Sequence, residues 1–217
     1  MKRSVTDYAT LIFDCDGVVL DSNRIKTDAF YQTTLSFGEV AAQAMVEYHV
    51  ANGGVSRYQK FEYFLRRIVK AHDIDNKLAN LLTDFSRRVS DALMKCAIDE
   101  SLADLRVATE HSKWLIVSGG DQNELRDVFK RRALAAFFDG GIFGSPDTKE
   151  SILAREIESG NIALPALFLG DSRYDYEVAT GAELDFVFVS RWTEVNSWSD
   201  FTEAVGALSI ERMGDLL

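Results

Sequence analysis

Five short runs of apolar residues constrain the fold of this chain more than any other feature. Each run is nearly continuous rather than alternating, which is typical of a strand buried on both faces of a parallel sheet. Segments with helical periodicity separate most of the later runs, so we expect right-handed strand–helix–strand units. The predicted strands are residues 10–14, 114–118, 140–144, 166–171 and 186–190, and the predicted helices between the later ones are 121–133, 148–158 and 173–180.

The long interval between the first and second predicted strands breaks this alternation. It holds four helical patterns and no convincing strand, at residues 25–37, 41–51, 57–72 and 76–96. In the third pattern, Phe61, Phe64, Leu65 and Ile68 recur on one helical face. We therefore predict an α/β fold whose Rossmann-like parallel-sheet core, residues 1–21 and 98–217, is interrupted after its first strand by an all-helical domain, residues 22–97.

The overall composition excludes several classes of function. The chain has 217 residues, of which 47% are hydrophobic, and this is enough for one sizeable core. The net charge is −10 without a stripe of Lys or Arg, so no nucleic-acid partner is expected. No apolar run approaches the ~20 residues that span a bilayer, and no signal-peptide core follows the N-terminus. We expect a cytoplasmic protein without a membrane partner, and we make no prediction of its oligomeric state.

Polar side chains follow the ends of four predicted strands. Ligands of open parallel sheets bind outside the carboxyl ends of the strands, so we expect these side chains to lie near one another. They are Asp14 and Asp16 after the first strand, Ser118 at the second, Lys149 past the third, and Asp171 and Asp175 after the fourth. Gly119, which follows Ser118, adds a backbone N–H group.

This constellation predicts a magnesium site for a phosphoryl group. Four clustered carboxylates cannot all stay ionised unaided, because like charges raise each other's pKa. Mg²⁺ prefers carboxylate oxygens together with water and substrate phosphate. Lys149 and the backbone N–H groups near Ser118 and Gly119 could hold the anion, and a carboxylate is available as nucleophile.

The same residues resemble the four motifs of the haloacid dehalogenase superfamily, in its phosphoglycolate phosphatase and beta-phosphoglucomutase branch. The matching stretches are FDCDGVVLDS, LIVSGG, SPDTKES and GDSRYDYEVA, in that order. The resemblance implies that the helical insertion is a cap that closes over the cleft and selects the substrate.

The resemblance also implies a role for each motif residue. Asp14 would be the nucleophile and Asp16 the general acid and base. Ser118 and Lys149 would bind the phosphoryl group. Mg²⁺ would be held by Asp14 and the backbone carbonyl of Asp16, with Asp171 and Asp175 in support. Dehalogenating members lack an acid at the Asp16 position, so its presence favours phosphoryl chemistry.

The expected function is therefore a Mg²⁺-dependent phosphatase that hydrolyses a small phosphorylated metabolite through an aspartyl-phosphate. A phosphomutase of the beta-phosphoglucomutase type shares all four motifs and stays open. A phospho-acceptor signalling domain is disfavoured, because such a domain has no helical insertion and places its acceptor Asp on a later strand. A catalytically silent protein on this fold is disfavoured because every chemical position is filled.

Within the insertion, the stretch NGGVSRYQKFEYF is the most similar to a binding site. We predict that Arg57 and Lys60 contact the substrate, the alternative being solvated side chains on a helix turn. Asn23 and Lys26, just past the first motif, could also face the cleft. The three histidines, at positions 49, 72 and 111, lack metal-ligand spacing and receive no predicted role.

Overall fold

The computed structural model describes residues 3–217 and contains a six-stranded, fully parallel sheet in the order β3-β2-β1-β4-β5-β6. The strands are β1 (Thr10–Phe13), β2 (Lys113–Asp121), β3 (Gly141–Ser145), β4 (Ala166–Gly170), β5 (Asp185–Val189) and β6 (Leu208–Ile210). The predicted α/β fold is thus confirmed. The edge strand β6 was not predicted, because it has only three residues and is partly exposed.

Both faces of the sheet are covered by helices, as the continuous apolar runs require. Leu11 and Phe13 of β1 belong to the hydrophobic cluster that includes residues of α5 (Leu102–Ala108) and α6 (Gln122–Arg131). Ile12 points to the other face, where it packs in the cluster of α7 (Lys149–Glu158) and α8 (Arg173–Gly181). Alternate residues of the same buried strand therefore serve two separate cores. The last α-helix of the described residues is α9 (Trp198–Val205).

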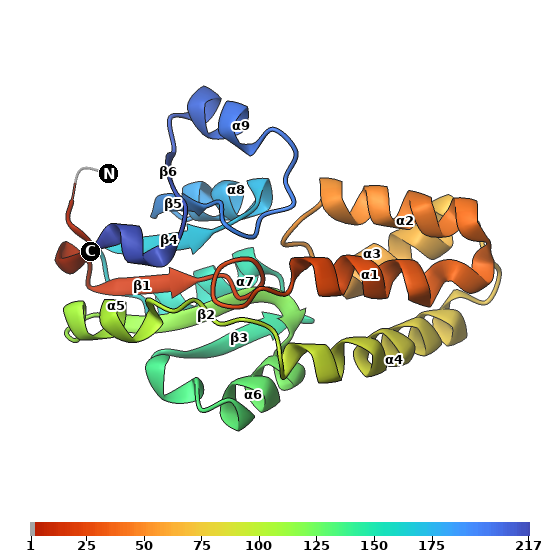
Figure 1. Cartoon of the computed structure of the whole chain (residues 1–217), viewed down its shortest axis with the longest axis horizontal. Helices are drawn as coiled ribbons and strands as arrows, with labels where there is room; N and C mark the ends of the chain where they lie inside the picture. The colour runs from red at the N-terminus through yellow and green to blue at the C-terminus, as the bar shows by residue number, and fades with distance from the viewer. Residues whose placement is uncertain (1–2) are drawn as a thin grey trace.

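Five α-helices lie between β1 and β2 in the sequence, and the first four of them extend beyond the carboxyl ends of the strands (Figure 1). These four are α1 (Asn23–Thr34), α2 (Glu39–Ala51), α3 (Arg57–Tyr63) and α4 (Ile74–Leu93), and the chain continues from α3 into a π-helical turn at Phe64–Ile68. Aromatic rings packed at tilted angles fill their interior: the Phe30 centroid lies 5.0 Å from that of Phe61 and 4.5 Å from that of Phe85.

The chain enters and leaves this helical unit at adjacent points. The amide of Asp21 donates to the carbonyl of Ala97, and the amide of Asp99 donates to the carbonyl of Val19, both at 3.0 Å. Backbone hydrogen bonds therefore join the two connections between the sheet and the helical unit. This pairing supports, as a proposal, the division of the chain near residues 21–22 and 97–98.

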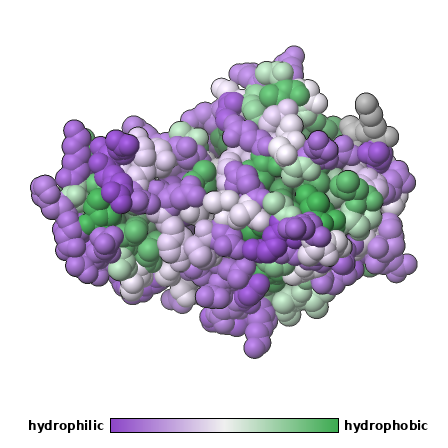
Figure 2. All heavy atoms as spheres, turned by 180° about the vertical axis from the view of Figure 1, so that it is seen from behind, coloured by the Kyte–Doolittle hydropathy of each residue, from purple (hydrophilic) through white to green (hydrophobic). Residues whose placement is uncertain are grey.

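The surface is mainly polar, in keeping with the acidic composition. Seen from behind, hydrophilic side chains cover most of the molecule, with smaller hydrophobic areas between them (Figure 2). Among residues 3–217, no helix combines the length and the apolar character needed to cross a membrane.

Candidate active site

The carboxylate of Asp14 lies directly after β1, where the sheet ends. Its backbone amide continues the sheet by donating to the carbonyl of Leu169 at 2.9 Å, and the residue is 2% exposed. The amide of Cys15 donates to Asp14 Oδ1 at 2.7 Å. The strand therefore fixes this carboxylate in a position that solvent barely reaches.

A buried lysine holds Asp14 beside a second carboxylate. Lys149 Nζ, at the first residue of α7, lies 3.1 Å from Asp14 Oδ1 and 2.5 Å from Asp175 Oδ1. Burial would lower the pKa of Lys149, but the two carboxylates outweigh burial and raise it. Ser172 completes the arrangement as the N-cap of α8, since its hydroxyl and amide both bond to Asp175 Oδ2.

The third member of the cluster is Asp171, which follows β4. Carboxylate oxygens of Asp14, Asp171 and Asp175 all lie within 4.8 Å of one another, and all three residues are buried. Burial and the two neighbouring carboxylates raise the pKa of Asp171 well above its usual range. Burial also raises the pKa of Asp14 to about 7, although Lys149 opposes the shift. One ammonium does not balance three carboxylates, so the donor set fits a hard divalent cation.

Close packing around Asp171 explains one glycine of the first motif. The Asn23 amide donates to Asp171 Oδ2 at 2.6 Å and to the carbonyl of Trp192 at 2.9 Å. A Cβ at Gly17, whose φ is +78°, would lie 2.1 Å from Asp171 Oδ2. Only glycine therefore fits between the first motif and this carboxylate.

Asp16 occupies a different environment from the three-carboxylate cluster. It forms an ion pair with Lys26 of α1, and the Ser22 hydroxyl donates to its Oδ1 at 2.5 Å. Burial alone would raise the pKa of Asp16, but Lys26 and Ser22 outweigh burial and lower it. Lys26 and Asn23 both line the cavity at this end of the sheet, a placement that the sequence left open, whereas the Asp16 side chain stands apart from the candidate metal ligands.

The second motif lies within β2 rather than after it, because β2 extends to Asp121. The fully buried Ser118 hydroxyl accepts a hydrogen bond from the amide of Gly120 at 3.0 Å. Gly119 and Gly120 form the cavity wall at this point. Asp121 caps α6 by accepting from the amide of Glu124.

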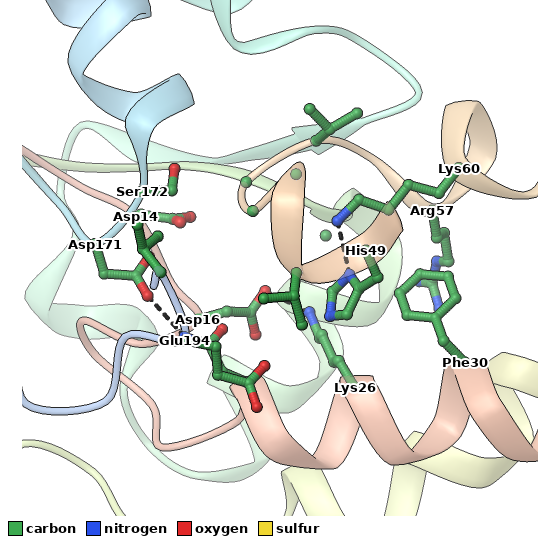
Figure 3. A pocket seen from close by; sticks show the side chains of 18 of the residues that line it. Asp14, Asp16, Lys26, Phe30, His49, Arg57, Lys60, Asp171, Ser172 and Glu194 are labelled. Atoms are coloured by element: carbon green, nitrogen blue, oxygen red, sulfur yellow. Dashed lines mark hydrogen bonds and ion pairs between the residues drawn. The ribbon is translucent and has the colours of Figure 1, made fainter. Parts of the chain in front are cut away.

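A cavity of about 60 Å³ separates these residues from the helical unit (Figure 3). Arg57 and Lys60 both line it, and Ser56, the N-cap of α3, accepts from the amide of Gln59. The Arg57 guanidinium forms a bidentate ion pair with the Glu124 carboxylate of α6, with nitrogen–oxygen distances of 3.0 and 3.2 Å.

Several cavity residues carried no recognisable signal in the sequence. His49 of α2, Phe30 of α1 and Phe85 of α4 line the cavity because of how the helices pack on one another. Glu194, in the loop after β5, also lines it and accepts from the Thr27 hydroxyl at 2.5 Å. The helical periodicity of the segments that hold His49, Phe30 and Phe85 marked them as core or surface, not as part of a site.

The loop at residues 52–55 contacts the core directly. A Cβ built on Gly119 would lie 2.1 Å from the carbonyl oxygen of Gly54, and one on Gly54 would lie 2.8 Å from Ser172 Oγ. The Gly119–Gly54 part of this contact, at one side of the cavity, involves backbone atoms alone.

We expect Gly119→Ala to hold the 52–55 loop away from the core, because the new methyl group collides with a backbone carbonyl. Misplacing binding groups by about 1 Å can reduce turnover roughly 100-fold, so kcat/KM of the variant should fall by that order. Gly181→Ala is the matched control, since nothing lies within 4 Å of its added Cβ. Steady-state kinetics with a phosphate ester measure both variants, and equal activity would contradict a role for this contact.

The chain belongs to the haloacid dehalogenase-like hydrolase family, whose model matches residues 8–183. No curated protein matches the sequence. Among solved structures, similar folds include a predicted phosphatase from Clostridium acetobutylicum (17% identity, TM-score 0.73, 96% of each chain covered). Others are a beta-phosphoglucomutase from Clostridium difficile (15%, TM-score 0.72, 96% of this chain and 93% of that one) and CbbY from Rhodobacter sphaeroides in complex with phosphate (17%, TM-score 0.69, 96% of each). At these identities the similarity is one of fold.

Proposed function

We propose that this hydrolase is a Mg²⁺-dependent phosphatase that acts on a small phosphorylated metabolite through an aspartyl-phosphate on Asp14. One observation carries the proposal: the Asp14 carboxylate is fixed at the end of β1, pairs with Lys149 and faces a cavity that Asp16 also lines. The proposal treats residues 22–97 as a cap that encloses the substrate.

In the first step, an oxygen of Asp14 attacks the phosphorus of the ester, and the bond from phosphorus to the leaving oxygen breaks. Asp16 gives that oxygen a proton. Because Lys26 and Ser22 lower the pKa of Asp16, the reactive form is its minor, protonated state, which Lys26 keeps positioned. Lys149 neutralises charge between the phosphoryl group and Asp14. Backbone N–H groups near Gly119, with the Ser118 hydroxyl, orient the phosphoryl oxygens.

In the second step, water attacks the phosphorus of the aspartyl-phosphate. Asp16 accepts a proton from that water, the bond from phosphorus to Asp14 breaks, and inorganic phosphate leaves. Asp14, Asp171 and Asp175, with the backbone carbonyl of Asp16, would hold Mg²⁺. Bound there, the ion supplies charge neutralisation for the phosphoryl oxygens and for the carboxylate cluster.

Phosphate release from a panel of phosphorylated metabolites tests this proposal. We expect turnover with Mg²⁺, loss of turnover with EDTA, and recovery when excess Mg²⁺ is added. Mg²⁺ should also raise the melting temperature of the protein without substrate, because it relieves repulsion among the buried carboxylates. Unchanged turnover in EDTA would contradict the metal requirement.

The same assay separates the phosphatase from a phosphomutase, which one structural neighbour's name suggests. A mutase would convert a hexose phosphate into its positional isomer without net phosphate release. That result would overturn the hydrolase proposal while leaving the aspartyl-phosphate in place.

A further inference from the structure

Three cationic side chains line the part of the cavity that the helical unit contributes. Lys26 pairs with Asp16, and Arg57 pairs with Glu124. The third cation, Lys60, differs from them: among residues 3–217, no carboxylate oxygen lies within 4 Å of its Nζ.

The Lys60 side chain is deeply buried, with 2% of the residue exposed. Its Nζ reaches the cavity wall and lies 2.8 Å from Nδ1 of His49, the only hydrogen-bond partner that the described residues give it (Figure 3). The ring of Phe30 lies beneath it, with the centroid 5.6 Å away. Neither His49 nor Phe30 supplies negative charge.

His49 is held as a neutral hydrogen-bond acceptor for this lysine. Its ring packs against Phe30 with a centroid separation of 4.5 Å. Burial, and then the ammonium groups of Lys60 and Lys26, lower the pKa of His49 well below its usual range. The histidine therefore orients the ammonium group without balancing its charge.

A buried ammonium without a carboxylate in contact is costly, because the more distant Asp16 and Asp14 offset its lost hydration only in part. Burial and the neighbouring Lys26 accordingly lower the pKa of Lys60 to about 7. An anion bound in the cavity would offset this cost. The cavity that Lys60 lines is also lined by Asp14 and Asp16. One small molecule bound in it could therefore contact Lys60 at one end and these two carboxylates at the other.

We propose that Lys60, oriented by His49, binds a carboxylate on the substrate, at the end remote from the transferred phosphoryl group. The inference rests on the proposed phosphatase function and narrows its substrate to phosphorylated carboxylic acids. One unpaired positive charge matches one carboxylate, whereas a second phosphate group would bring an excess of negative charge. Phe30 and Phe85 provide apolar walls for a carbon skeleton between the two ends.

Matched phosphate esters test the subsite. Phosphoglycerate is compared with glycerophosphate, and phosphogluconate with sorbitol phosphate, so that each pair differs chiefly in the carboxylate. We expect the carboxylated member to have the higher kcat/KM. Lys60→Met should lower kcat/KM for that member by about 10- to 100-fold, mainly through KM, and change the neutral member little.

Lys95→Met, which replaces an exposed lysine after α4, is the control and should leave both members unchanged. Folding of Lys60→Met is checked by its melting temperature, which should not fall, because methionine replaces an uncompensated buried charge. An equal loss for both members of a pair would mean a purely structural lysine and would overturn the subsite. A preference for a sugar bisphosphate over the carboxylated esters would overturn the choice of a carboxylate.

A binding measurement separates failure of this inference from failure of the proposed function. Glycerate, the product without phosphate, should raise the melting temperature of the wild-type protein and not that of Lys60→Met. If no ester is hydrolysed, including p-nitrophenyl phosphate, but glycerate still binds through Lys60, then the phosphatase proposal fails and the subsite stands. If esters are hydrolysed and glycerate shifts both proteins equally, the subsite fails alone.

Discussion

Asp14→Asn is expected to abolish phosphate release, with kcat reduced by roughly 10⁴-fold or more. The amide has nearly the same shape as the carboxylate but is a far weaker nucleophile towards phosphorus. The fold should persist, because the substitution removes one of three buried carboxylates that repel one another. Phosphate release under saturating substrate and Mg²⁺ measures the effect, and thermal melting checks the fold.

Asp139→Asn is the control for this experiment. The Asp139 carboxylate accepts from the amide of Trp114 near the opposite end of the sheet, so its replacement should leave turnover unchanged. Turnover in Asp14→Asn close to that of the wild type would remove Asp14 from the reaction.

Asp16→Asn is expected to give the second-largest effect, and the effect should depend on the leaving group. An alkyl phosphate needs a proton on its leaving oxygen, so its turnover should fall by about 10²- to 10⁴-fold. Nitrophenolate leaves without a proton, so the first step with p-nitrophenyl phosphate should survive. The second step should be slow, because no base remains to activate water.

Rapid-mixing kinetics distinguish the two steps. The variant should release a burst of nitrophenolate close to one equivalent of enzyme and then turn over slowly. Absence of a burst together with wild-type turnover of the alkyl ester would contradict the role of Asp16 as acid and base.

Much of the fold could be predicted, and so could the part of the site that the sheet domain contributes. Both depend on local sequence. The apolar run before Asp14 marks a buried strand, and parallel strands deliver their carboxyl ends to one edge of the sheet. The structure accordingly brings Asp14, Lys149, Asp171 and Asp175 together. These contacts follow from topology, so exact packing was not needed to expect them.

The part of the site that the helical unit contributes could not be predicted in the same way. Lys60 meets His49 because α2 and α3 pack at one particular angle and register, which helical periodicity does not specify. Arg57 was expected to contact substrate, and the structure additionally places it against Glu124 of α6, a partner 67 residues away. The contact of Gly119 with Gly54 involves two residues without side chains, so no chemical pattern marks it.

The most direct test of the account is chemical trapping of the phosphorylated residue. Enzyme quenched during turnover is treated with borohydride, which reduces an aspartyl-phosphate to homoserine, and peptides are then sequenced by mass spectrometry. We predict homoserine at position 14, dependent on substrate and absent from Asp14→Asn. Steady turnover with homoserine at another position, or with no homoserine in samples that contain trapped acyl phosphate standards, would contradict the account.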